Sequence, residues 1–115
     1  MTAWDAVRWV DEKKHNVYSL EDKLKWLSQL EAMDCRLRCR LGGTVSPREL
    51  TPESVLTIPE PYDQLYLRWL EAQIDYTAQE YGSYNNAMAT FSALWQDYAN
   101  DAARRASLRG QWRFF

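Results

Sequence analysis

The sequence is poor in glycine, proline and cysteine, and these shortages narrow the fold class. Its 115 residues include four Gly, four Pro and two Cys. Sandwiches and barrels need many tight turns, for which Gly and Pro are favoured, so an all-β fold is disfavoured. The two thiols, Cys35 and Cys39, do not by themselves make a zinc site, and they fit a reducing compartment.

Long apolar runs are missing as well. No stretch approaches the roughly 18–20 apolar residues that a membrane-spanning helix requires. The first residues carry Asp5, Asp11 and Glu12 in place of the basic-then-apolar pattern of a secretory signal. We therefore expect the protein to stay in the cytoplasm of the cell that makes it, with no membrane partner.

Residues that carry catalysis or hold cofactors are scarce too. The single histidine, His15, lies near the end of a predicted helix, where the helix dipole or solvent is its usual partner. There is no Gly-rich phosphate loop, nucleophile elbow, dinucleotide fingerprint or metal-type His/Cys cluster. Glu71 and Asp75 stand one helical turn apart beside Arg68, which is typical of a solvated ladder of ion pairs. We expect no enzymatic activity, no cofactor and no catalytic or metal-binding residue.

Apolar and aromatic residues, by contrast, are plentiful. Hydrophobic residues make up 46% of the chain and charged residues 26%, and there are six Trp and seven Tyr. This is the balance of one globular domain with a core of its own. Trp and Tyr combine a large apolar body with a polar tip, so they suit cores and interfaces alike.

Charge is distributed unevenly along the chain. The net charge is −2, but residues 1–101 sum to −6 and residues 102–115 to +4. An acidic body followed by a basic end is typical of an interaction segment. The last residues add three aromatic side chains, which are anchor-type residues at interfaces. The candidate partner-interface residues are therefore Arg104, Arg105, Arg109, Trp112, Arg113, Phe114 and Phe115. Folding of these aromatics onto the chain's own core is an equally good alternative.

Two helices are predicted in the first third of the chain. Thr2 and Asp5 form a capping pattern for a helix over about Ala3–Lys14. Ser19 is the expected N-cap of a second helix, which carries leucines at helical spacing and ends at Gly42-Gly43. Arg36, Arg38 and Arg40 lie in its last turns, but alternate residues on a helix point in different directions. The three arginines therefore cannot form one stripe, and with an acidic body we expect transient rather than tight DNA contact.

Two further helices are predicted after a long connector. Residues 42–60 hold three of the four prolines and show little periodicity. Pro61 is the expected first residue of the third helix. Gly82-Ser83 is the expected break before the fourth helix, although one continuous helix keeps the hydrophobic phase almost as well. The third helix is apolar around most of its circumference, apart from a narrow polar arc of Gln64, Arg68, Glu71, Asp75 and Gln79.

Together these patterns predict an all-α fold. We expect a four-helix, single-domain bundle over residues 1–103, with a long Pro-containing connector between the second and third helices. Residues 104–115 are expected to form a basic-aromatic C-terminal tail that acts as an interaction segment.

Several short motifs resemble a family of small proteins from tailed bacteriophages, encoded among the head-completion and head–tail joining genes. The pattern joins P-Y-D-x-L-Y to A-Q-I-D-Y, E-Y and Y-N-N. Its main residues here are Pro61, Tyr62, Asp63, Tyr66, Gln73, Asp75, Tyr76, Tyr81, Tyr84, Asn85 and Asn86. The upstream runs V-D-x-x-K-x-N and K-x-x-W-L fit as well, through Val10, Asp11, Lys14, Asn16, Lys23, Trp26 and Leu27. The resemblance covers residues 7–91, departs at Thr77-Ala78-Gln79, where relatives often carry Asn-Gly, and does not include the tail.

The resemblance implies a structural role in the neck of the virion. Such a subunit forms a homo-oligomeric ring, contacts the portal protein and tail-side neck proteins, and lines a channel through which double-stranded DNA passes. It would reside in the virion after assembly and in the cytoplasm of the bacterial host before it. The alternative function is that of a small helical binding protein, either a DNA-packaging accessory or a host-directed regulator.

Overall fold

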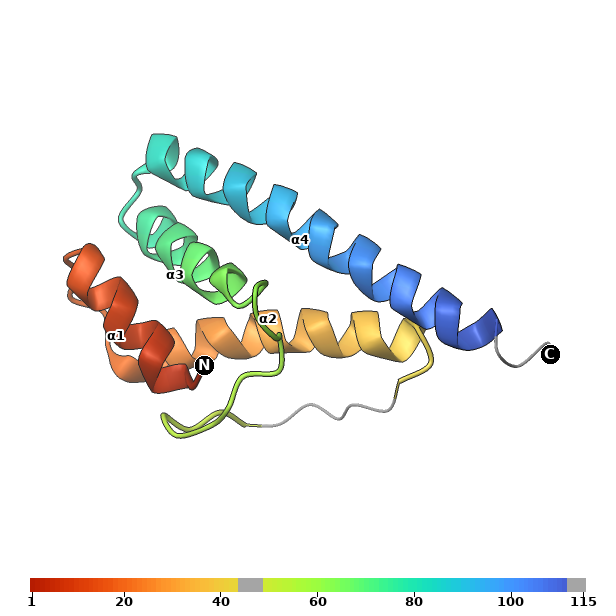
Figure 1. The fold of residues 1–115 in the computed structure, drawn as a ribbon. Coiled ribbons are helices and arrows are strands. Elements are labelled where there is room, and N and C mark those ends of the chain that lie inside the picture. Colours follow the sequence, from red (N-terminus) through yellow and green to blue (C-terminus); the bar gives the residue numbers. More distant parts are fainter. Residues whose placement is uncertain (44–48, 112–115) are drawn as a thin grey trace.

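The computed structural model describes residues 1–43 and 49–111, and side chains as far as Leu108. Four helices make up this part of the protein (Figure 1): α1 over Ala3–Lys13, α2 over Leu20–Arg40, α3 over Gln64–Thr77 and α4 over Tyr81–Gln111. The described residues contain no β-strand, and Thr2 and Val55 form only an isolated bridge. The predicted all-α, single-domain, four-helix fold is therefore confirmed.

The two predicted N-caps are present. The Thr2 hydroxyl accepts from the Asp5 backbone N–H at 3.1 Å, and the Asp5 carboxylate accepts from the Thr2 N–H at the same distance. The hydrogen bond from the Thr2 backbone N–H to the carboxylate is the main cause that lowers the pKa of Asp5, and the nearby Thr2 side chain is the second. Ser19 caps α2 by accepting from the Asp22 N–H at 3.2 Å. Side-chain oxygens thus satisfy N–H groups that have no partner inside the helix.

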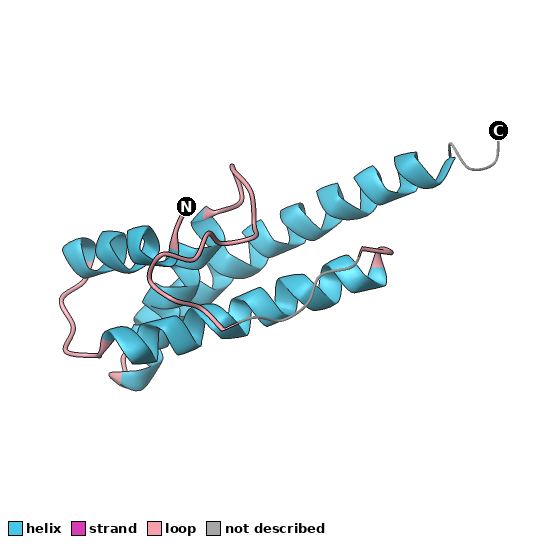
Figure 2. Cartoon of the chain, turned by 90° about the horizontal axis from the view of Figure 1, so that it is seen from below, coloured by secondary structure: helices cyan, strands magenta, loops and turns pink. Residues whose placement is uncertain are grey.

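The connector turns back along the bundle and meets the N-terminus (Figure 2). The Ala3 N–H donates to the Ser54 carbonyl and the Trp4 N–H to the Pro52 carbonyl, both at 2.9 Å. These bonds supply acceptors for the first N–H groups of α1. Leu56 and Ile58 then enter the core. The described part of the connector is consequently an integral part of the domain.

The start of α3 differs from the prediction. Pro61 lies in a turn after a cis peptide bond with Glu60, and α3 begins three residues later. Successive i→i+3 hydrogen bonds bring the chain into the helix: Tyr62 N–H donates to Pro59, Leu65 to Tyr62, and Tyr66 to Asp63. The prediction of Pro61 as the first helical residue was therefore wrong, because these turns intervene.

The break between α3 and α4 also lies elsewhere than predicted. It comes at Ala78–Glu80, and Gly82 is inside α4. Glu80 donates its backbone N–H to the Asp75 carbonyl at 2.8 Å, and Gln79 donates to the Tyr76 carbonyl at 3.0 Å. This pair of bonds is a Schellman motif, with Gln79 at the left-handed position (φ 62°). The prediction of a break was right, but Gly82-Ser83 was the wrong place for it.

Helix α3 lies at the centre of the bundle and contacts each of the other helices. Its buried residues include Leu65, Tyr66, Leu67, Leu70 and Ile74. Helix α4 packs along it and then extends past the end of α2 (Figure 1), so that residues 104–111 continue the same helix. The predicted boundary at residue 103 thus falls inside α4. None of the described helices is both long and apolar enough to cross a membrane.

Candidate functional site

Five polar side chains from three helices and the connector meet inside the bundle. We name them the carboxylate–tyrosine cluster: Glu31 and Asp34 of α2, Thr57 of the connector, Tyr66 of α3 and Tyr98 of α4. Asp34 is fully buried and Glu31 is 8% exposed. Buried carboxylates are uncommon unless they are paired. The cluster therefore places two buried carboxylates next to an otherwise apolar core.

Glu31 binds the connector and α3 together. It accepts hydrogen bonds from the Tyr66 hydroxyl and, at 3.1 Å, from the Thr57 backbone N–H. The Tyr66 oxygen in turn accepts from the Ile58 backbone N–H at 2.8 Å. The Thr57 hydroxyl lies 3.0 Å from Glu31 Oε2 and 2.7 Å from Asp34 Oδ2, and it donates to one of them at a time.

Asp34 binds α4 and a cation. The Tyr98 hydroxyl donates to Asp34 Oδ1 at 2.5 Å, and Arg38 Nε lies 2.9 Å from Asp34 Oδ2. Another nitrogen of Arg38 donates to the Thr57 carbonyl at 2.6 Å. Burial, followed by the hydrogen bond to Asp34, raises the pKa of Tyr98 to about 12. Burial and the nearby Glu31 carboxylate likewise raise the pKa of Tyr66 above its ordinary value.

This arrangement joins three helices and the connector through two buried carboxylates. Each carboxylate oxygen is occupied by hydroxyl, amide or guanidinium groups, and the cluster contains no histidine and no cysteine. Across the described residues, no three His, Cys, Asp or Glu side chains come close enough to hold a metal ion. Beside the cluster, a hollow of about 350 Å³ lies between the end of α2 and α4, lined in part by Arg38, Tyr62 and Arg105.

A clue to the cluster was present in the sequence. Asp34 occupies a position of the leucine stripe of α2, four residues after Leu30 and three before Leu37. A carboxylate at a core position needs buried partners. The partners come from segments about 20 to 60 residues away, however, so spacing alone does not identify them.

The structure corrects the environment predicted for Asp75. Its side chain is 2% exposed, and Lys14 Nζ lies 2.6 Å from its Oδ1 atom. Arg68 and Glu71 do form the predicted surface ion pair, at 2.7 Å. The solvated ladder was therefore wrong for Asp75, because the end of α1 covers that edge of α3 and its C-cap residue, Lys14, supplies a cation.

Motif residues from distant segments pair with one another. Asp11 binds Lys23 at 2.7 Å and accepts from Asn16 at 3.1 Å. Lys14 binds Asp75. The runs V-D-x-x-K-x-N, K-x-x-W-L and A-Q-I-D-Y are thus joined in space by ion pairs, at the junction of α1, α2 and α3.

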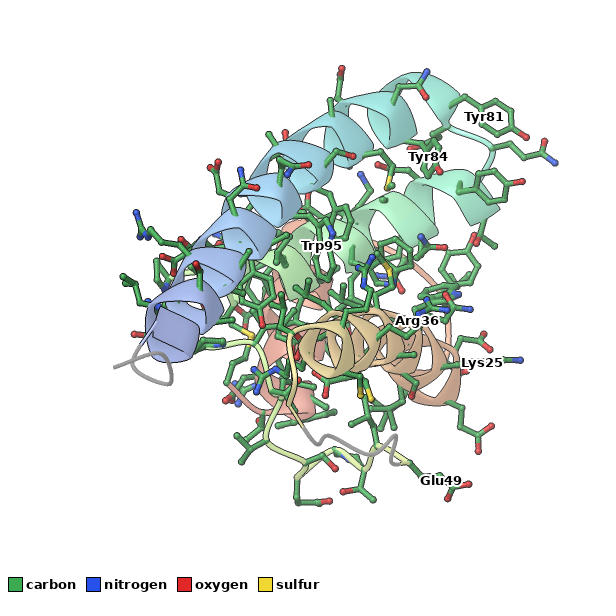
Figure 3. The ribbon with its side chains drawn as sticks, turned by 90° about the vertical axis from the view of Figure 1, so that its right-hand side faces the viewer. Lys25, Arg36, Glu49, Tyr81, Tyr84 and Trp95 are labelled. Atoms are coloured by element: carbon green, nitrogen blue, oxygen red, sulfur yellow. The ribbon has the colours of Figure 1, made fainter. Side chains whose placement is uncertain are left out.

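Other motif residues gather at the same, C-terminal end of α3, next to the turn into α4. The Tyr76 ring lies 6.0 Å from the Tyr81 ring and 5.2 Å from the Tyr84 ring, between centroids. We name these three the tyrosine cluster. Tyr76 and Tyr81 are more than half exposed, and the nearby Asn85 and Asn86 are exposed as well. Figure 3 shows Tyr81 and Tyr84 at this end of the molecule. Of the remaining motif residues, Asp63 and Tyr66 are buried, Tyr62 and Gln73 are half-buried, and Pro61 is exposed.

The candidate residues of the tail are only partly described. Arg104 and Arg105 both pair with Asp101, at 2.5 and 3.0 Å. Arg109 belongs to α4, and Trp112, Arg113, Phe114 and Phe115 lie outside the described residues. Asp101 therefore offsets part of the positive charge that the sequence assigns to this end.

The arginine trio of α2 is divided as predicted. Arg38 points inward to Asp34, whereas Arg36 and Arg40 are exposed and one turn apart.

Comparisons with protein-family models, with curated protein sequences and with solved structures found no match.

Proposed function

We propose that this chain is a structural subunit of a phage neck, which forms a homo-oligomeric ring between the portal and the tail and continues the DNA channel. The observation that carries the proposal is the pairing of motif residues across the fold. Asp11 with Lys23 and Lys14 with Asp75 join three motif runs into one structural unit. A chance resemblance between short runs gives no reason for their side chains to meet.

The exposed motif residues support a role in docking. Buried motif residues such as Tyr66 are explained by packing, but Tyr76 and Tyr81 are more than half exposed. Exposed aromatic side chains grouped in one place are typical of protein–protein contacts. We assign the tyrosine cluster to contact with a neck partner.

Two further features suit a channel-forming subunit. The carboxylate–tyrosine cluster fixes the connector to three helices, which gives a rigid building block. Residues 1–101 have a net charge of −6, and like charge lets DNA slide past rather than adhere.

The direct test is reconstitution with the portal protein of the same phage. Negative-stain images of the mixture are expected to show an added ring beneath the portal, and a pull-down is expected to recover both proteins. The variant Y76A/Y81A is expected to lose portal binding while it keeps the wild-type melting temperature. The control Q96A/N100A changes two exposed residues of α4 and is expected to bind normally. Failure of the wild-type protein to bind the portal would overturn the proposal.

A DNA-packaging accessory is the second candidate, favoured by one observation. Lys25, Arg36 and Arg40 lie exposed on α2 without an acidic partner among the described residues. For a neck subunit we expect weak, non-specific duplex binding that falls steeply with salt. Nanomolar, sequence-dependent binding near physiological salt would favour the accessory function instead.

A further inference from the structure

The outward side of α2 borders an open hollow that no part of the described chain fills. The hollow measures about 560 Å³ and reaches Trp95 of α4; it is lined by Met33, Cys35, Arg36, Cys39, Arg40 and Trp95. We name it the α2 hollow. Met, Trp and Arg are the residue types enriched at the centres of protein interfaces. Its composition is thus that of a docking site rather than of ordinary surface.

The α2 hollow is positively charged, and the fold explains why. The only acids between Lys25 and Arg40 are Glu31 and Asp34, and both are buried in the carboxylate–tyrosine cluster. Arg36 and Arg40 therefore face solvent, and neither forms an ion pair with a carboxylate in the described parts of the chain. Figure 3 shows Arg36 and Lys25 on the outer side of α2, with Trp95 on α4 above.

A second surface has complementary properties. Trp4 is 44% exposed and Val55 is 62% exposed, and the backbone bonds between α1 and the connector hold them in one place. Asp5 and Glu53 are exposed acids beside them, and Arg8 lies one turn further along α1. We name Trp4, Asp5, Glu53 and Val55 the α1 knob. A shallow depression of about 470 Å³ adjoins it, lined by Thr2, Trp4, Pro52 and Glu53.

We propose that the α1 knob of one copy docks on the α2 hollow of the next copy. The exposed Trp4 ring can enter the opening bordered by Met33 and Trp95. Arg36 and Arg40 carry the charge opposite to that of the acids beside Trp4. Arginine also stacks on the face of Trp, which adds a cation–π attraction. The occupant of the hollow is then a second copy of this chain, and the inference rests on the proposed ring.

The α1 knob and the α2 hollow of one molecule cannot contact each other. The buried side of α2 packs against the rest of the bundle, so the outward side that carries Arg36 faces away from α1. The contact is therefore heterologous, with different surfaces on the two partners. Heterologous contacts build a ring when the rotation between neighbours closes, and an open filament when it does not. The pairing thus accounts for a ring without a two-fold axis.

Charge exchange tests the pairing directly. Sedimentation velocity of the purified protein, without portal, measures self-association of wild type, R36E/R40E, E53R and the chain that carries all three changes. Each partial variant is expected to self-associate at least about tenfold more weakly, because like charges then face each other. The combined variant exchanges the signs and is expected to recover most of that loss. Glu53 is chosen over Asp5 because Asp5 also caps α1.

A matched control separates a specific contact from net charge. K13E/K25E changes the net charge as much as R36E/R40E does, at exposed positions outside both surfaces, and is expected to alter self-association by less than about threefold. Additive losses in the combined variant would overturn the pairing, as would a wild-type protein that stays monomeric. Unchanged self-association of R36E/R40E together with weaker duplex binding would overturn it in favour of a DNA-contacting surface.

Cross-linking gives a second measurement. Cys39 already lines the α2 hollow, so E53C places a thiol on each of the two surfaces. Mild oxidation of E53C is expected to give a ladder of covalent species beyond the dimer, whereas E53C/C39S is expected to stop at the dimer. A ladder absent from E53C would overturn the pairing. Portal docking is measured separately, so failure of this inference and failure of the neck assignment are distinguishable.

Discussion

Gln79 has a backbone conformation that side chains rarely adopt. Its φ of 62° is left-handed, and it occupies the position of the Schellman motif at which glycine is favoured. In the resembled phage proteins the same stretch often carries Asn-Gly, the two residues that tolerate this conformation best. The α3–α4 turn is therefore strained at one residue, while its hydrogen bonds are intact.

We expect Gln79→Gly to stabilise the protein. Removing the Cβ relieves a strain of about 1 kcal/mol in the folded state. Glycine also raises the conformational entropy of the unfolded chain, which offsets only part of this gain. Urea denaturation is expected to show a gain of roughly 0.5 kcal/mol in the free energy of unfolding. Gln64→Ala, at an exposed helical position, is the control and is expected to change it by less than about 0.5 kcal/mol. A loss of stability in Gln79→Gly would show that the Gln79 side chain contributes contacts of its own.

Tyr66 is expected to be among the residues most sensitive to a single-atom change. Tyr66→Phe removes the oxygen that donates to Glu31 and accepts from the Ile58 N–H. Two buried polar groups are then left with fewer partners, and the expected loss is about 1–3 kcal/mol. Tyr81→Phe removes an exposed hydroxyl and is expected to be nearly neutral by the same denaturation measurement.

Alkaline pH is expected to destabilise the fold through Tyr98. The pKa of Tyr98 is about 12 in the folded protein, against an ordinary value of 10.0. Between these values the unfolded chain has lost the proton and the folded chain has kept it, so stability is full below pH 10 and falls as pH rises toward 12. Urea midpoints measured across this range are expected to fall less steeply in Tyr98→Phe than in wild type. Equal slopes would mean that Tyr98 ionises normally in the folded state.

At the scale of elements, the sequence predicts what is local and misses what is remote. The capping pairs Thr2–Asp5 and Ser19–Asp22 are short-range signals, and α1 and α2 begin where these signals predict. The turns before and after α3 depend on backbone hydrogen bonds, and the residue types in these turns do not predict them. Gly82 looks like a breaker, yet Gln79 adopts the left-handed conformation.

The candidate sites follow the same rule. Amphipathic spacing identifies which face of a helix is apolar, but Asp75 was assigned to solvent because its partner, Lys14, comes from a distant segment, the C-cap of α1. The carboxylate–tyrosine cluster was missed for the same reason, since it joins α2, the connector, α3 and α4. Pairing between residues far apart in the sequence depends on the assembled fold. The periodicity of one segment therefore cannot predict it.

Helix α3 is expected to show one sensitive side and one tolerant side. Trp69 packs its ring 5.1 Å from that of Phe91, and its Nε1 donates to the Trp26 carbonyl at 2.7 Å. Trp69→Ala is expected to cost about 3 kcal/mol, from lost packing and the lost hydrogen bond to the Trp26 carbonyl. Gln64→Ala, on the exposed side, is again the comparison. Equal losses in the two variants by chemical denaturation would contradict the assignment of these faces.

At the scale of the whole molecule, the length of α4 sets the shape. The described part measures 55 × 29 × 19 Å, and the 31 residues of α4 run past the rest of the bundle. Asp101 partly neutralises Arg104 and Arg105, which lowers the positive charge of the described last turns of α4. These turns form an arm that extends past the end of α2 (Figure 1).

Removal of the tail tests whether this arm docks on a partner. The core contacts of α4 end near Ala102, and Leu108 is 53% exposed, so deleting residues 104–115 leaves the carboxylate–tyrosine cluster and the main core intact. Circular dichroism is expected to show slightly less helix, from the loss of residues 104–111, and a melting temperature within about 3 °C of wild type. Portal pull-down is expected to fail, because the tail combines aromatic anchors with steering charge. Trp112→Ala alone is expected to weaken portal binding by about 2 kcal/mol, whereas Arg109→Glu is expected mainly to slow association.

The two opposite results would each have a definite meaning. A truncated protein that unfolds would show that the tail completes the subunit's own core, which is the alternative that the sequence leaves open. A truncated protein that docks normally would show that the tail is dispensable, and portal contact would then fall to the tyrosine cluster. Light scattering adds a third readout, because self-association through the α1 knob and the α2 hollow uses none of residues 104–115. Truncation is therefore expected to separate the two kinds of assembly, removing portal docking while copies of the chain still bind one another.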